Sequence, residues 1–490
     1  MPEQLDRRAL IRYAGVGLIA AVGGPTALTA LGGGAVPSAR AAAREETGPA
    51  LLRPGDPGFD AECSGFNPIV RHRPKAVALP ADAAETAEAV RYARYRGWPI
   101  AVQATGHGIG VAADGALLIN TRKLTGVHVD PAARTARIEA GLRWGPVVDA
   151  IAPYGLAALS GSSVDVGAVG YTLGGGLGLL GRRYGYAADR VRSLRIVTPD
   201  GRIRTASPTR NRELFWGARG AKSNFGVVTS ADIELFPVAR VHGGVLNFPG
   251  AKAAAVLDAY RAWTGSLTEA TTSSFQFLRL PDDPALPPPL RGQFIVSIAL
   301  GHLGSAADGD ELVRPLRALG PFMDTVGERP YAEFAAMFTE GPTSLPIHER
   351  TGLVRTLDAS TADLLLDMAG PGATLPTGVV SIRHLGGALG RPAPVPNAIG
   401  LRDAAFTLYL ANPADPEAAD ATRRTQQRLM NGLRPALTGG AFPNFLGHAD
   451  DTTAKVRAAY SAADYARLRR LKRACDPSNL FRVNHNIPPA

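Results

Sequence analysis

Two glycine-rich segments constrain the fold of this chain more than any other feature. The first runs from Thr105 to Gly110, and the second runs from Gly167 to Gly178. Glycine allows backbone N–H groups to approach an anionic ligand closely, so each segment predicts a loop that cradles a diphosphate. Because both lie within a regular α/β pattern, they predict a binding site for a ligand that contains a diphosphate.

The region before the first glycine-rich segment reads as a strand, a helix and a second strand. Short apolar runs occupy residues 76–79 and 99–102, and a helical period occupies residues 83–95 between them. This order is typical of nucleotide-binding folds. No glycine-rich fingerprint follows the first strand, however, so a Rossmann-type dinucleotide site is disfavoured.

The composition changes after about Pro237, and a second domain is expected there. The pattern predicts a broad sheet backed by helices. Its clearest strand occupies residues 292–297, and its two amphipathic helices occupy residues 251–263 and 414–433. Proline-rich spacers lie at residues 281–288 and 391–396.

The net charge of +10 does not indicate a nucleic-acid partner. Basic residues are scattered, and the one dense run, at 467–473, reads as the solvated face of a helix. The two cysteines, Cys63 and Cys475, are not spaced like metal ligands, so no metal site is expected. A disulfide between them and two free thiols both remain open.

The N-terminus predicts an export signal. Arg7 and Arg8 precede an uncharged stretch rich in glycine and alanine, and a small-residue cleavage signature ends at Ala41. This is the twin-arginine pattern, which predicts a partner in the twin-arginine export machinery. We expect cleavage near residues 41–43 and a secreted or extracytoplasmic protein. Pro25 and the many glycines weaken the alternative of a membrane anchor, so stable membrane insertion is not expected.

Further motifs, in a fixed order, identify a family resemblance. They lie at residues 106–107, 166–176, 189 with 194–198, 214–220, 224–229, 383–388, 465–468, 476–482 and 484–489. In this order the chain resembles the berberine-bridge-enzyme-like oxidases, within the group that shares the vanillyl-alcohol-oxidase FAD-binding fold. The resemblance covers roughly residues 55 to 490.

The resemblance implies an α+β fold with a bipartite FAD-binding domain and a substrate domain built on a large antiparallel sheet backed by helices. Residues 1–43 are expected to be the signal peptide, and residues 44–238 the first part of the FAD-binding domain. Residues 239–447 would form the substrate domain, and residues 448–490 would return to complete the FAD-binding domain.

The resemblance also implies that FAD is bonded covalently to His107. Such a bond would raise the redox potential of the flavin and prevent its loss outside the cell, which suits a protein exported in the folded state. The residues expected to surround FAD are Thr105, Gly106, His107, Gly108, Gly110, Ser163, Val166, Gly167, Gly170, Gly174, Gly175, Gly176, Gly226, Val228, Asn484 and Asn486.

Two departures from the family pattern affect the flavin environment. Ser163 stands where many relatives carry a cysteine that forms a second bond to FAD, and a hydroxyl lacks the nucleophilic anion of a thiolate. A single bond is therefore expected. Val166 stands at the flavin edge that meets oxygen, where a small side chain resembles the oxygen-permissive relatives; an ordinary core valine is the alternative.

A third departure concerns the catalytic base. Many relatives carry a tyrosine in a Y-x-N-[YF] segment, and this chain has Phe442 there, which cannot accept a proton. Tyr409, Tyr171 and His348 are the candidates to replace that tyrosine. Each of them also has a purely structural interpretation as a packed side chain.

The first functional hypothesis is an FAD-dependent oxidoreductase that oxidises an alcohol, a sugar or an activated C–H group by hydride transfer and passes the electrons to O2. Tailoring of a secreted metabolite or oxidation of a carbohydrate would fit export. A dehydrogenase with another electron acceptor is the second hypothesis. The third is a flavin-bearing protein that only binds a ligand or guides a non-redox reaction. The sequence identifies neither the substrate nor the oligomeric state.

Overall fold

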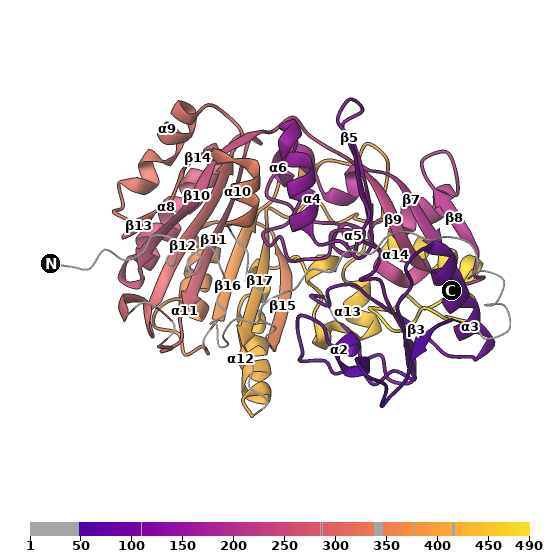
Figure 1. The fold of residues 1–490 in the computed structure, drawn as a ribbon. Helices are drawn as coiled ribbons and strands as arrows, with labels where there is room; N and C mark the ends of the chain where they lie inside the picture. The colour runs from indigo at the N-terminus through magenta and orange to yellow at the C-terminus, as the bar shows by residue number, and fades with distance from the viewer. Residues whose placement is uncertain are drawn as a thin grey trace.

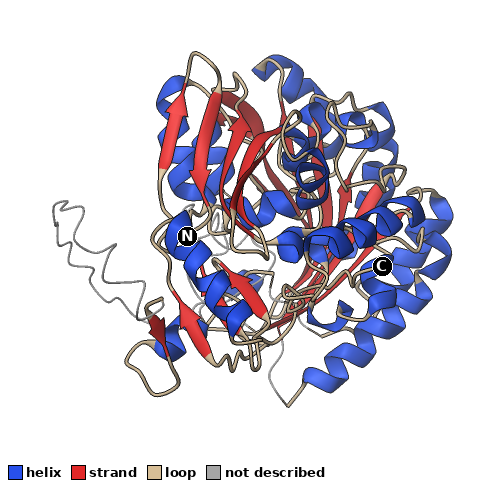
Figure 2. Ribbon diagram, turned by 90° about the vertical axis from the view of Figure 1, so that its right-hand side faces the viewer, coloured by secondary structure: helices blue, strands red, loops and turns tan. Residues whose placement is uncertain are grey.

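The computed structural model describes residues 49–490 except 109, 285, 287, 338–345, 377 and 414–416. The predicted signal peptide lies outside the described residues. Three sheets organise the rest of the chain, and Figure 2 shows the strands inside the molecule with most helices around them. Among the residues that the structure describes, no helix combines the length and apolarity needed to span a bilayer.

The first sheet contains the predicted strand–helix–strand unit. Its strands are β1 (Leu51–Leu52), β2 (Ala76–Ala78), β3 (Ile100–Gln103) and β4 (Leu117–Asn120), in the order β1-β2-β4-β3, with β2 and β3 parallel to β4. Helix α3 (Ala83–Tyr95) has the bounds that the helical period predicts, and the Asp82 side chain caps its N-terminus by accepting from the Glu85 N–H.

The second sheet is antiparallel and follows in the chain. Its strands are β5 (Val127–Asp130), β6 (Thr135–Glu139), β7 (Val191–Val197), β8 (Ile203–Ala206) and β9 (Val227–Glu234), in the order β5-β6-β9-β7-β8. Helices α4 (Trp144–Ile151), α5 (Ala168–Leu173) and α7 (Arg212–Ala218) contribute to its apolar core. The second glycine-rich segment therefore includes a short helix, α5.

The third sheet has eight strands, and every pairing in it is antiparallel. The strands are β10 (Arg240–Pro249), β11 (Thr271–Arg279), β12 (Phe294–His302), β13 (Met323–Asp324), β14 (Gly327–Pro330), β15 (Ile347–Val354), β16 (Gly378–His384) and β17 (Phe406–Pro413). It occupies the left part of Figure 1, and the first two sheets occupy the right. The predicted large antiparallel sheet is confirmed.

Helices cover one face of the third sheet. They are α8 (Ala253–Ser266), α9 (Ala306–Arg317), α11 (Ala359–Ala369) and α12 (Ala419–Gly432). Alternation along the strands separates the two faces. On β11, Phe275 and Phe277 pack in the core beneath the helices. Thr272, Ser274 and Gln276 point to the opposite face and line a cavity.

The C-terminal segment returns to the first sheet. Helix α14 (Ala462–Cys475) packs near α7, and beyond it the Leu480 carbonyl accepts from the Ile100 N–H at 2.9 Å. A parallel bridge then joins Val483 to Ala101. The turn is fixed by a fully buried ion pair, Lys472 Nζ to Asp476 Oδ2 at 2.8 Å, with Lys472 also donating to the Asn224 and Phe481 carbonyls.

Both cysteines are free in the structure: Cys63 is buried and Cys475 is partly buried. The disulfide alternative is therefore not realised. The remaining short helices are α2 (Phe59–Cys63), α6 (Gly181–Tyr184), α10 (Tyr331–Ala336) and α13 (Thr453–Arg457).

Candidate active site

A cavity of about 400 Å³ lies between the first two sheets and the face of the third sheet opposite its covering helices. Most residues predicted to surround the cofactor line it, together with both tyrosines considered as bases. These lining residues are Thr105, Gly106, His107, Gly108, Gly110, Ser163, Val166, Gly167, Gly170, Tyr171, Gly226, Val228, Tyr409 and Asn484.

Gly174, Gly175 and Gly176 of the second glycine-rich segment, which were predicted to surround FAD, do not line the cavity. A Cβ atom on Gly174 would collide with the Asn444 side chain, and one on Gly175 would lie 2.9 Å from the Phe442 ring. A Cβ on Gly176 would collide with Ala187. All three glycines therefore allow neighbouring segments to pack closely, because a side chain at any of these positions would displace a neighbour.

Two other predicted residues also lie away from the cavity. Asn486, expected to contact the cofactor, does not line it. His348 on β15 is buried on the face of the strand that points away from the cavity, where its Nδ1 lies 3.1 Å from His448 Nε2. Strand alternation explains this placement, because Ile347 and Glu349 point to the cavity and His348 points to the opposite face.

The His107 ring is held on one face and at one nitrogen. It stacks on Phe66 with ring centroids 3.8 Å apart, and its Nδ1 lies 2.9 Å from Thr105 Oγ1, which also accepts from the Gly167 N–H at 3.3 Å. The other nitrogen, Nε2, is buried and has no hydrogen-bond partner among the described residues. Burial, and secondarily Arg143, lowers the pKa of His107 to about 3, so the ring is neutral at physiological pH.

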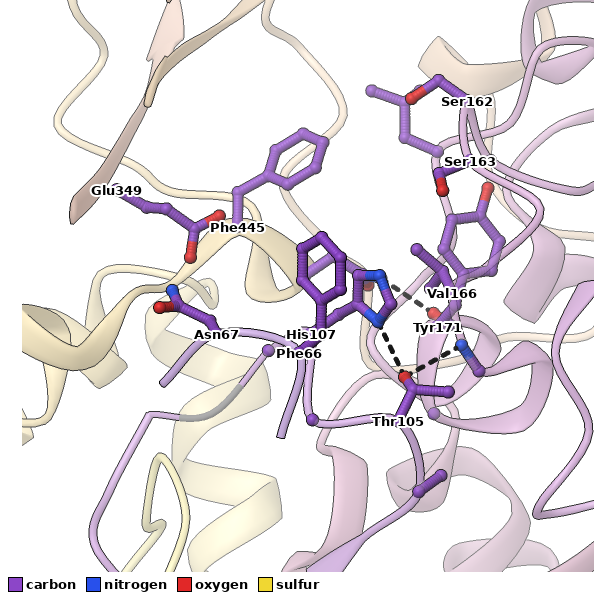
Figure 3. Close-up of a pocket in the computed structure, with 18 of the residues that line it drawn as sticks. Phe66, Asn67, Thr105, His107, Ser162, Ser163, Val166, Tyr171, Glu349 and Phe445 are labelled. Atoms are coloured by element: carbon purple, nitrogen blue, oxygen red, sulfur yellow. Dashed lines mark hydrogen bonds between the residues drawn. The ribbon is translucent and has the colours of Figure 1, made fainter. Parts of the chain in front are cut away.

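One side wall carries side chains that lie just before or within the second glycine-rich segment. Figure 3 shows Ser163, Val166 and Tyr171 on one side of His107, and Glu349 and Phe445 on the other. Ser163 is buried, and its hydroxyl accepts from the Asp165 N–H at 3.3 Å. Val166 is half-buried and borders the cavity.

Tyr171 is suited to donate a proton rather than to accept one. Its hydroxyl is buried without a hydrogen-bond partner among the described residues, and its ring meets Trp144 edge-on at 5.6 Å. Burial raises the pKa of Tyr171 well above its usual value, because the tyrosinate would be poorly solvated there. Tyr171 therefore stays protonated and is a poor base.

The opposite wall places Tyr409 beside a carboxylate that the sequence analysis did not identify. The Tyr409 hydroxyl donates to Glu349 Oε1 at 2.5 Å. Antiparallel pairing of β15 and β17 sets Tyr409 opposite Thr351 and Glu349 opposite Ala411, so the two side chains are diagonal neighbours on the cavity face. The Tyr409 ring also packs against Phe445, with centroids 5.0 Å apart.

Two cations complete the polar lining, and neither was predicted. Arg383 on β16 holds its guanidinium 5.9 Å from the centre of the Tyr409 ring and 5.2 Å from that of Phe445. Lys222 enters from the loop between α7 and β9. The only signal in the sequence was the position of Arg383 within a recognised motif; nothing pointed to Lys222 or Glu349.

Phe442, which replaces the expected tyrosine, does not reach the cavity. It is buried, stacks on Tyr186 with centroids 5.3 Å apart, and belongs to a core that includes Leu177 and Ile399. The aromatic side chain of this segment that faces the cavity is Phe445. A hydroxyl added to Phe442 would therefore enter an apolar core rather than the site.

Comparisons with known proteins agree with this architecture. The family model of the FAD binding domain matches residues 74–207, and the model described as berberine and berberine like matches residues 444–488. The (R)-6-hydroxynicotine oxidase of Paenarthrobacter nicotinovorans is 30% identical over 463 residues, which cover 90% of this chain and 96% of the relative.

Solved structures share the fold over nearly the same span. The 6-hydroxy-D-nicotine oxidase of Arthrobacter nicotinovorans superposes with a TM-score of 0.80 at 26% identity, covering 91% of this chain and 98% of that one. The xylooligosaccharide oxidase of Myceliophthora thermophila gives a TM-score of 0.80 at 22% identity, with the same coverages of 91% and 98%.

Proposed function

Because this chain belongs to the berberine-bridge-enzyme-like FAD-linked oxidoreductases, we propose that it carries FAD covalently on His107 and oxidises an alcohol, a sugar or another activated C–H group of a small organic molecule. The observation that carries the proposal is the cavity in which His107 lies across from the Tyr409–Glu349 pair.

The residues around His107 fit an FAD molecule. Cβ atoms on Gly108 and Gly170 would meet nothing within 4 Å, so both glycines border open space that a cofactor can occupy. His107 Nε2 is buried and has no hydrogen-bond partner in the part of the chain that the structure describes. When Nδ1–H donates to Thr105, Nε2 presents its lone pair, which is the requirement for alkylation by the flavin. Ser163 offers no thiolate, which supports a single attachment.

Bound FAD supplies the redox chemistry, because its ring accepts the electron pair of a substrate C–H bond. The protein must position the substrate and remove the proton of its hydroxyl or amine group. Tyr409 is placed to accept that proton while its own hydroxyl proton moves to Glu349 along the 2.5 Å hydrogen bond. Phe445 and the Tyr409 ring form an apolar wall against which a substrate would be held.

Oxygen is the proposed electron acceptor, with hydrogen peroxide as its product. Val166 supports this assignment, since its short side chain borders the cavity in the wall across from Glu349 and leaves room beside the cofactor. Release of peroxide by the enzyme with a turning-over substrate would establish an oxidase, and turnover with a dye but without peroxide would establish a dehydrogenase.

Covalent attachment can be tested on the purified protein. The yellow colour should stay with the polypeptide after acid precipitation, and His107→Ala should release FAD to the supernatant or fail to bind it. His72→Ala is a matched control, because His72 also lines the cavity but is predicted to carry no flavin. Colour in the supernatant of the unaltered protein would refute the bond to His107.

The substrate class can be tested with alcohols, sugars and cyclic amines under anaerobic conditions. The relatives include a hydroxynicotine oxidase and an oligosaccharide oxidase, so both classes belong in the panel. Bleaching of the flavin absorbance identifies a substrate. A flavin that no member of the panel reduces, although dithionite reduces it, would favour the binding or non-redox alternative.

Export through the twin-arginine route is also proposed. It rests on Arg7, Arg8 and the cleavage signature ending at Ala41. Replacing both arginines with lysine should retain a full-length precursor in the cytoplasm. Normal yields of processed protein outside the cytoplasm would contradict the assignment.

A further inference from the structure

Lys222 occupies a strained backbone position at the edge of the cavity. It has a φ of 53°, in the left-handed region, and opens the short helical turn Lys222–Phe225. The other non-glycine residues with positive φ among those described are Arg134, Asn211 and Asn479, and none of them lines the cavity. A lysine is disfavoured in this conformation, in which glycine or asparagine is tolerated, and such strain concentrates at functional sites.

The surroundings make room for the Lys222 side chain. A Cβ atom on Gly174 would lie 3.1 Å from Lys222 Cε and would collide with Asn444, so the absence of a side chain at Gly174 lets these two side chains lie side by side. The His485 ring lies against Gly110 of the first glycine-rich loop. Lys222 therefore lies beside the second glycine-rich segment, and its charge acts on His485, which lies against the first.

The Lys222 side chain lines the cavity and is half-buried. The charged and titratable groups that act on it are Glu349, from the opposite wall, and His485, which burial keeps neutral. Burial lowers the pKa of Lys222 to about 8, and Glu349 only partly opposes this effect. Glu349 is already bonded to Tyr409, so the cation is left to face the interior of the cavity.

We propose that Lys222 is a catalytic cation that faces the flavin and stabilises the negative charge that the flavin acquires on reduction. This inference rests on the proposed FAD-dependent function. In the reaction, the substrate C–H bond breaks and its electron pair passes with the hydrogen to the neutral flavin ring, which gains one negative charge. The O–H or N–H proton of the substrate goes to the Tyr409–Glu349 pair and does not neutralise that charge.

A fixed cation beside the developing charge lowers the free energy of the reduced state, because it needs no solvent reorganisation. Reoxidation by O2 removes the charge, as two electrons and two protons leave as hydrogen peroxide. Lys222 would therefore raise the midpoint potential of the flavin. Glycine would fit this backbone conformation better than lysine, but it carries no charge. A need for the charge therefore explains why a strained lysine occupies the position.

The test compares three variants of the holoenzyme. Lys222→Met removes the charge and keeps the strain, Lys222→Gly removes both, and Lys222→Arg keeps the charge. We expect Met and Gly to weaken flavin reduction at least tenfold, which lowers the two-electron midpoint potential by about 30 mV, while Arg stays near the unaltered protein. Potentials are measured by dye-coupled reductive titration, and FAD content by colour retained after acid precipitation.

Thermal unfolding separates the two properties of Lys222. The Gly variant should unfold at a higher temperature than the Met variant, since only glycine relieves the left-handed backbone, although both should show the same lowered potential. A merely structural Lys222 predicts a stability change without a change in potential, and that outcome would overturn the proposal.

Two further outcomes are decisive. If Lys222→Met loses FAD but its remaining holoenzyme keeps the normal potential, the cation serves the diphosphate and not the ring, which contradicts the proposal. Unaltered protein that contains no FAD would instead refute the proposed function itself. Failure of the proposed function is therefore recognised from the unaltered protein alone, whereas failure of the Lys222 proposal is recognised from the variants.

Discussion

Disruption of the Tyr409–Glu349 pair is expected to slow flavin reduction strongly. The hydroxyl-to-carboxylate distance of 2.5 Å is typical of a charge-assisted O–H···O⁻ bond. Glu349→Gln keeps the size of the side chain and removes the negative charge that takes up the proton. Tyr409→Phe removes the hydroxyl that would contact the substrate.

The magnitude follows from the role of a general base, which contributes about 10²–10⁴-fold to a rate. Either substitution alone should therefore raise the barrier by about 2.7–5.4 kcal/mol, at 1.36 kcal/mol for each factor of ten. Because both groups handle one proton, the double variant should be hardly slower than the slower single variant. Independent roles would instead give multiplied losses.

The assay is the single-turnover rate of flavin reduction in an anaerobic stopped-flow instrument at saturating substrate. Covalent FAD should be unaffected, since neither residue touches His107. Glu328→Gln is the matched control, because Glu328 belongs to the same sheet but forms an exposed ion pair with Arg240 at 2.7 Å. A neutral Glu349→Gln, or strictly multiplied losses in the double variant, would refute the shared proton route.

Three further predictions concern oxygen access, stability and pH. Val166→Leu should slow reoxidation of the reduced enzyme in air by about tenfold, or roughly 1.4 kcal/mol, while leaving anaerobic reduction unchanged; equal reoxidation rates would remove Val166 from the oxygen path. Asp476→Asn should cost about 3–5 kcal/mol in urea unfolding, because it leaves the Lys472 ammonium buried and unpaired, and a loss below about 1 kcal/mol would contradict this. Burial lowers the pKa of His485 from 6.5 to about 4, so the unfolded chain binds a proton that the folded chain refuses; stability should be complete above pH 6.5 and fall as the pH drops toward 4, and an unfolding temperature that is flat over this range would exclude the effect.

The sequence predicted the local elements well where a single pattern decides them. Helix α3 has its predicted bounds, and α8 and α12 overlap their predicted segments, because an amphipathic period and a capping residue act over a few turns. Glycine-rich loops were harder to interpret. Residues 105–108 and Gly110 reach the cavity as expected, but Gly174–Gly176 allow close packing. The composition of the two segments does not show which of these two roles a glycine has.

Only one residue of the proton-accepting pair, Tyr409, could be predicted from the sequence. Tyr409 was identified from its place in an apolar strand, but Glu349 is brought to it by the register between β15 and β17, two strands separated in the chain by β16 and α11. Register depends on tertiary pairing rather than on local sequence. Phe442 was expected at the site because of its place in a motif. A motif gives the order of residues, but it does not show whether Phe442 or Phe445 points into the cavity.

The path of the chain at its C-terminal end determines when this protein can mature. Val483, Asn484 and His485 line the cavity together with Phe66 and residues 105–108, so segments near both ends of the described chain form its walls. During synthesis, the ribosome must release the final segment before the cavity is complete. We therefore expect flavin to bind after this segment has been made, and a nascent chain stalled before residue 480 should contain two formed N-terminal sheets but bind no flavin.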